Sequence, residues 1–167
     1  MDELFQNKYR IRSARATWCN YNEGVYFVTI CTKDKCHYFG EIIDEEMTYS
    51  SVGKRAVECV AEISDYYPQV VVVGSVVMPN HVHLVLIIKN DLPVSSSAEE
   101  SCKSSSLSSI IGNFKASVTR FAHRQRIPFS WQSRYHDHII RKQEELSKIM
   151  DYVLNNVHRW SQDRYKD

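Results

Sequence analysis

Two histidines one residue apart, His81 and His83, are the residues whose types and spacing most directly suggest chemistry. They open an apolar stretch that follows a Pro79-Asn80 turn signal, which is typical of the start of a strand. Residues two apart on a strand point to the same face, so the two imidazoles project together. The alternate positions from Val82 to Ile88 are all apolar and supply a core-facing surface. Paired neutral imidazoles suit a divalent metal, and histidines hydrogen-bonded to their neighbours are the alternative interpretation.

A second pair, Tyr152 and Asn156, has the four-residue spacing that places two side chains on one helix face, a turn apart. The apolar stripe of the same segment includes Ile149 and Val153, and the pair lies on the flank of that stripe. The pair is therefore expected to overlook a cleft beside the sheet. A half-buried tyrosine with a surface amide is the alternative.

Charge is balanced overall, with a net charge of +1, but it is distributed unevenly. Residues 113–142 hold seven Lys or Arg against one Asp, whereas residues 41–65 hold seven acidic residues against two basic ones. Aromatic residues, among them Phe114, Phe129 and Trp131, alternate with the arginines. Stacking rings beside a cationic groove are typical of single-strand binding, while a solvated helix face is the alternative.

The elements that must position these residues follow from periodicity and from Gly, Pro and Ser signals. The pattern predicts strands over 25–32, 70–77, 81–88 and 135–140, a hairpin over 39–49, and helices over about 51–67, 107–126 and 144–158. This order predicts an α+β fold, a ferredoxin-like sandwich with an antiparallel sheet of four to five strands. An extra C-terminal helix carries Tyr152.

Length and composition predict one domain over residues 1–167, with a flexible Ser-rich loop at about 91–109. The sequence has no apolar run long enough to span a membrane and no signal-peptide core at its N-terminus, so a cytoplasmic location is expected. The five cysteines include no CxxC pair and are expected to be reduced thiols.

Several motifs in this order resemble the single-tyrosine HUH transposases, in particular those associated with repetitive extragenic palindromes (REPs). They are YFVTICT at 26–32, FGEI at 39–42, MPNHVH at 78–83, FKASVT from 114, WQ at 131, YHDHIIR from 135 and YVLNN at 152–156. The resemblance covers most of the chain. One departure is Val157, where the family usually has proline, which predicts that the last helix runs further.

The resemblance implies a role for each matched position. His81 and His83 would be paired metal ligands, Asn156 a third ligand, and Tyr152 the nucleophile that forms a 5′-phosphotyrosine with single-stranded DNA. Mg²⁺ or Mn²⁺ would bind the scissile phosphate and offset the charge that builds on it. The expected partner is single-stranded DNA bearing a hairpin, at the nucleoid. Its backbone and bases would contact six residues: Lys115, Arg120, Arg124, Trp131, Arg134 and Arg141.

Three alternatives remain at this stage. A domesticated, inactive relative would bind DNA hairpins without forming a covalent adduct. A hydrolytic metal nuclease would use water in place of Tyr152. An RNA-recognition domain shares the sheet plan, but its aromatic pattern is not found here. The family contains monomers as well as dimers that exchange the tyrosine helix, so a homodimer is an alternative to a monomer.

Overall fold

The computed structural model describes residues 24–89 and 106–166. The Ser-rich loop expected at about 91–109 lies mostly outside these residues, as do Cys19 and Cys102. The three described cysteines, Cys31, Cys36 and Cys59, are free thiols, as expected. None of the described helices combines the length and the apolar character needed to cross a membrane.

The elements follow the predicted order. They are β1 (Gly24–Cys31), the short 3-10 helix η1 (Lys33–Lys35), β2 (Gly40–Ile43), β3 (Glu46–Tyr49), α2 (Ser51–Tyr66), β4 (Val70–Val77), β5 (His81–Ile88), α3 (Leu107–Arg124), β6 (His136–Ile140), α4 (Gln143–Leu154) and η2 (Trp160–Gln162). β4 and β5 match the predicted bounds, because runs of β-branched residues there meet Pro and Asn at their ends.

Four strands form one antiparallel sheet in the order β4-β5-β1-β6, and β2 and β3 pair separately as a hairpin. This is the strand order of the ferredoxin-like sandwich, so the predicted fold class is confirmed. The register aligns Cys31 with His81, and Thr29 with both His83 and His136. Three neighbouring strands therefore bring polar side chains together near one end of the sheet.

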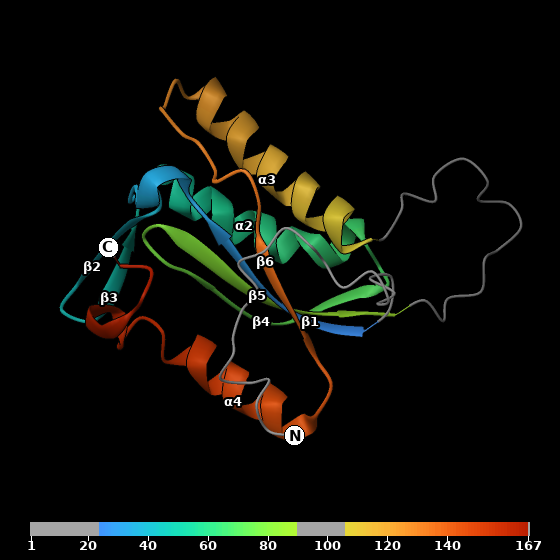
Figure 1. Cartoon of the computed structure of the whole chain (residues 1–167). Helices are drawn as coiled ribbons and strands as arrows, with labels where there is room; N and C mark the ends of the chain where they lie inside the picture. Colours follow the sequence, from blue (N-terminus) through green and yellow to red (C-terminus); the bar gives the residue numbers. More distant parts are fainter. Residues whose placement is uncertain (1–23, 90–105, 167) are drawn as a thin grey trace, which may run out of the picture.

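The two faces of the sheet carry separate cores. Helices α2 and α3 cover one face, and α4 lies against the other, as Figure 1 shows. Val82, Leu84 and Leu86 of β5 belong to the larger core beneath α2 and α3. Val85 points to the opposite face and packs in the smaller core beneath α4. The alternation expected from the sequence of β5 is therefore confirmed, and it directs both histidines to the α4 side.

Local signals fix the helices that hold this arrangement. The Ser50 hydroxyl caps α2 by accepting a hydrogen bond from Gly53 N at 3.0 Å. Gly53 is required for packing, because a Cβ atom there would lie 2.0 Å from the carbonyl oxygen of Phe39. The β2–β3 hairpin can thus approach the first turn of α2 closely.

The last helix differs from its prediction. It ends at Leu154 and does not continue to about residue 158. Asn155 still bonds back to Asp151 in helical fashion, but the backbone N–H of Asn156 reaches the carbonyl oxygen of Val153, three residues earlier, at 3.4 Å. The regular helix therefore gives way to a tighter turn at this point. The inference that Val157 would let the helix run further is therefore wrong. Asn156 lies just beyond the helix, in the turn that follows.

Candidate active site

The pair His81 and His83 lies at the start of β5 with both rings buried. The ring centroids are 4.6 Å apart. Because both residues sit on the sheet face opposite the larger core, their burial comes from α4 and from the segment that follows it. This placement gives the two imidazoles a setting separate from the packing of α2 and α3.

Hydrogen bonds behind the rings orient their free nitrogens. His81 Nδ1 lies 2.7 Å from Asn80 Oδ1, which can only accept, so this nitrogen donates and Nε2 carries the lone pair. His83 Nδ1 lies 2.9 Å from the hydroxyl oxygen of Thr29, which can accept its N–H in the same way. Such outer partners fix the tautomer and the ring orientation of metal-binding histidines.

Burial keeps both rings neutral. Desolvation lowers the pKa of His81 from 6.5 to about 3, and it lowers the pKa of His83 well below 6.5. Neutral imidazole is the form that ligates a metal, so the pair is ready to bind a cation at neutral pH.

Tyr152, on the half-buried flank of α4, reaches this pair within the same chain. Its hydroxyl oxygen lies 3.4 Å from Nε2 of His83. Its ring meets Phe27 edge-on, with centroids 6.2 Å apart and an interplanar angle of 89°. The packing therefore holds the phenol beside the ring nitrogen that would face an ion.

Asn156 also enters the site, although it lies outside the helix. It is 1 % exposed, and its side chain interacts with those of His81 and Asp163. Its Oδ1 atom finds no hydrogen-bond partner among the described residues. The structure thus brings together the four residues that the sequence suggested for metal and nucleophile. Asn156 reaches the site from the turn after α4, not from the helix itself.

Asp163 is a site residue that the sequence analysis missed. Its carboxylate joins the two histidines in a group whose ligand atoms all lie within 4.8 Å of one another. Among the described residues, three buried atoms of the site lack hydrogen-bond partners: His81 Nε2, Asn156 Oδ1 and Asp163 Oδ2. All three accept and none donates, which is the arrangement that a cation satisfies. The residues present therefore fit a divalent metal.

Lys115 and Trp131 lie near the end of β1, where Trp131 forms a bridge with Thr32. Trp131 packs against three phenylalanines of the core, and its indole N–H donates to the carbonyl oxygen of Lys115 at 3.1 Å. The structure thus gives Trp131 a packing role that the sequence did not suggest. Lys115 Nζ donates to the carbonyl oxygen of Gln132 at 2.9 Å, and burial lowers its pKa.

Two further cations that the sequence analysis did not select lie near the same strand end. Burial raises the pKa of Cys31 to about 11, and the charges of Arg164, Lys35 and Lys115 oppose that rise. All three cations are therefore close enough to act on the residue that pairs with His81. The three cations come from η1, α3 and the C-terminal segment, which are distant in sequence, and the carboxylate of Asp163 acts on Cys31 in the opposite sense.

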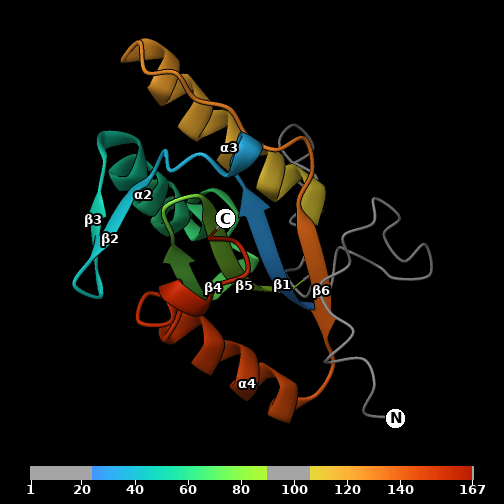
Figure 2. The ribbon, with the colours of Figure 1, turned by 60° about the vertical axis from the view of Figure 1, so that its left-hand side comes forward.

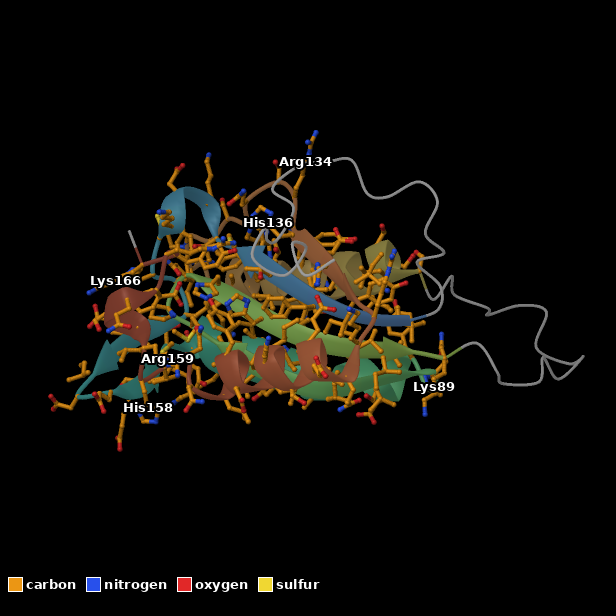
Figure 3. All side chains as sticks on the ribbon, turned by 60° about the horizontal axis from the view of Figure 1, so that its bottom comes forward. Lys89, Arg134, His136, His158, Arg159 and Lys166 are labelled. Carbon is orange, nitrogen blue, oxygen red and sulfur yellow. The ribbon has the colours of Figure 1, made fainter. Side chains whose placement is uncertain are left out.

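The remaining predicted DNA contacts are dispersed. Arg120 lines the crevice between α2 and α3, and Arg124 ends α3, so both belong to the helix layer opposite α4. Arg141 is exposed between β6 and α4. Figure 3 shows Arg134 projecting from the body of the protein just before β6. The structure does not gather these four arginines around the histidine pair.

Comparison with known proteins gives the chain its family. Residues 20–156 match the family described as "Transposase IS200 like". An uncharacterized protein of Haemophilus influenzae is 37% identical over 164 residues, which cover 92% of this chain and 91% of that protein.

Two solved structures are also similar. One, a REP-associated tyrosine transposase bound to a REP hairpin, has a TM-score of 0.61 at 16% identity, covering 87% of this chain and 74% of that one. The other, described as a "putative transposase" from Deinococcus radiodurans, has a TM-score of 0.44 at 16% identity, covering 85% of this chain and 96% of that one. The first likeness supports the α+β fold described above. Since the family match spans most of the sequence, this chain belongs to the IS200-like transposases, the single-tyrosine family that its motifs resemble.

Proposed function

We propose that this transposase cleaves and rejoins single-stranded DNA through a covalent bond to Tyr152, with Mg²⁺ or Mn²⁺ held by His81, His83 and Asn156. The observation that carries the proposal is the distance of 3.4 Å between the Tyr152 hydroxyl and His83 Nε2, beside acceptors that lack partners. The proposed nucleophile and the proposed cation site are thus adjacent in one chain.

The side chains divide the work. Asn80 and Thr29 hold the two imidazoles so that their Nε2 atoms are available as ligands. An ion held by these residues would supply positive charge to the oxygens of the scissile phosphate. Phe27 packs against the edge of the Tyr152 ring and limits its movement, which favours a defined line of attack.

The reaction exchanges one phosphodiester for another. The phenolic oxygen of Tyr152 forms a bond to phosphorus, while the bond from phosphorus to the 3′-oxygen of the preceding nucleotide breaks. The phenol proton is transferred, in the net reaction, to that 3′-oxygen. The products are a 5′-phosphotyrosine and a free 3′-hydroxyl, and attack by a second 3′-hydroxyl reverses the step. No nucleotide cofactor is consumed.

The DNA substrate is proposed to carry a hairpin and to be bound at the nucleoid. The similar solved structure is bound to a REP hairpin, which supports this choice. The cations Lys35, Lys115 and Arg164 near the end of β1 lie where a phosphate backbone would approach the site. Arg134 and Arg141 extend the proposed contact surface along the β6 edge.

The remaining predicted contacts, Arg120, Arg124 and Trp131, are proposed to act at a distance from the cleavage step. The two arginines lie on the α3 side and would contact a duplex stem, and Trp131 would offer only the part of its ring that the core leaves exposed. Since Tyr152 reaches the histidines of its own chain, the proposal requires no exchange of helices in a homodimer.

The test is a denaturing gel with Mn²⁺ and an end-labelled, hairpin-bearing single strand. Wild-type protein is expected to give a covalent adduct, and Tyr152→Phe none. Tyr66→Phe is the matched control, because Tyr66 is 63% exposed on α2 and should leave the adduct unchanged.

Each alternative gives a different result on the same gel. An adduct of undiminished yield in Tyr152→Phe would exclude Tyr152 as the nucleophile. Nicked DNA without attached protein would indicate hydrolysis by water, and hairpin binding without cleavage would indicate an inactive, domesticated protein.

A further inference from the structure

The C-terminal segment, residues 160–166, folds back over the histidine pair. Figure 2 shows the chain end passing over the central strands of the sheet. The carbonyl oxygen of Tyr165 accepts a hydrogen bond from Asn80 Nδ2 at 2.6 Å, and its ring lies 4.7 Å from that of His81. The centroid of the Trp160 ring lies 6.2 Å from that of the same histidine. The segment is therefore packed against the site by named contacts.

Within this segment, Asp163 directs one oxygen away from the site and one into it. Oδ1 accepts a hydrogen bond from the backbone N–H of Tyr165 at 2.8 Å. Oδ2 lies 3.8 Å from His81 Nε2 and lacks a hydrogen-bond partner among the described residues. The side chain is 2% exposed. A turn of the backbone thus fixes the carboxylate and aims its second oxygen at the site.

A direct hydrogen bond does not explain this contact. The separation of 3.8 Å exceeds hydrogen-bonding range, and the only ring proton of neutral His81 is on Nδ1, which faces Asn80. A buried carboxylate oxygen without a hydrogen-bond partner is costly, although the charge of Arg164 and the side chain of Asn156 lie close enough to favour the charged carboxylate. A cation between Asp163 Oδ2 and His81 Nε2 would complete the interactions of both atoms.

The geometry suits one shared ion. Two ligands that each lie about 2.1 Å from an ion at angles between 90° and 130° are about 3 to 3.8 Å apart. The separation of Asp163 Oδ2 and His81 Nε2 falls at the upper end of this range. Asn156, whose Oδ1 also lacks a partner, interacts with both residues.

We infer that Asp163 is a fourth protein ligand of the divalent ion, so that the ion fastens the C-terminal segment over the histidine pair. This inference rests on the metal centre of the proposed function and extends it. Four protein ligands leave about two positions of a six-coordinate ion for phosphate oxygens and water. The C-terminal segment would thereby set how much of the ion the DNA can reach.

Calorimetric titration of the full chain with Mn²⁺ tests the inference without any measurement of cleavage. Asp163→Asn is expected to bind Mn²⁺ at least tenfold more weakly than wild type, and His81→Ala to lose binding. Asp65→Asn is the matched control, because it removes the same charge from an exposed position on α2 and should bind as wild type does.

Hydrogen exchange provides the second measurement. In wild type, Mn²⁺ is expected to slow amide exchange in residues 160–166, and in Asp163→Asn it should not. The metal-free variant loses a buried charge, so it should unfold at the same urea concentration as wild type or at a higher one. Weaker Mn²⁺ binding would then not reflect misfolding.

Wild-type affinity in Asp163→Asn, or exchange in residues 160–166 that is indifferent to Mn²⁺ in the wild type, would overturn the inference. If the wild type forms the covalent adduct but Asp163→Asn binds Mn²⁺ as tightly as the wild type, the proposed function stands and only the role of Asp163 as a ligand is rejected. If Mn²⁺ binding depends on Asp163 but the wild type forms no adduct, the role of Asp163 as a ligand stands and the proposed function is rejected.

Discussion

Acidification is expected to weaken the metal-free protein because two buried histidines must stay neutral in the fold. Burial lowers the pKa of His81 from 6.5 to about 3 and lowers that of His83 in the same direction. Below pH 6.5 the unfolded chain takes up protons at these rings and the folded chain does not. The unfolding free energy therefore falls as pH decreases from 6.5 toward 3.

The size of the effect follows from the pKa of His81. Each pH unit below 6.5 costs about 1.4 kcal/mol per neutral ring, so His81 alone accounts for about 2 kcal/mol between pH 6.5 and pH 5. A urea m-value of about 2 kcal/mol/M converts this into a midpoint lower by about 1 M. Asp163 acts in the opposite direction, since burial raises its pKa and the fold takes up that proton more readily.

The assay is urea unfolding in the presence of a chelator at pH 7, 6 and 5, with His81→Gln as the comparison. The urea midpoint of the variant should depend less on pH than that of the wild type, by the contribution of one imidazole. One ring fewer takes up a proton when the variant unfolds. A wild-type midpoint that does not change between pH 7 and pH 5, or a variant with the full wild-type slope, would refute the burial argument.

Three further predictions address the supports of the site, the packing and the DNA surface. Asn80→Ala removes the acceptor behind His81 and should weaken Mn²⁺ binding about 10- to 100-fold by calorimetry; an unchanged affinity would contradict the orienting role. Gly53→Ala places a Cβ atom against a backbone oxygen and should lower the unfolding free energy by about 2 kcal/mol, whereas Gly112→Ala, with open space around it, should raise it by about 0.5 kcal/mol. Arg134→Ala should weaken hairpin binding. It should also reduce the slope of the logarithm of the binding constant against the logarithm of salt concentration by about the value of one phosphate contact, and an unchanged slope would place Arg134 outside the interface.

Local sequence signals were sufficient for most of the fold. The apolar residues at alternate positions after His81 predicted the strand and placed the two histidines on the face opposite Val82, Leu84 and Leu86, because successive side chains of a strand point to opposite faces. Pro68 and the Ser50 cap marked the ends of α2 in the same way.

Tertiary contacts decided the parts that sequence reasoning missed. Helix α4 ends at Leu154, after which the backbone N–H of Asn156 bonds to Val153 and not to Tyr152, a change that helical periodicity does not reveal. Asp163 reaches the site because the chain after α4 turns and folds back over the sheet. The number of residues between His81 and Asp163 therefore does not predict their contact. Trp131 suggested a stacking surface from composition, but its neighbours in space are core phenylalanines.

The most direct measurement of the central claim is to identify the peptide that carries the DNA. After reaction with Mn²⁺ and a hairpin-bearing single strand, the protein is digested with nuclease and trypsin and analysed by mass spectrometry. We expect a nucleotide on the tryptic peptide of residues 149–159, at Tyr152, and its disappearance when Mn²⁺ is chelated. A nucleotide on another tyrosine, such as Tyr165, or one that forms without any divalent ion, would contradict the account.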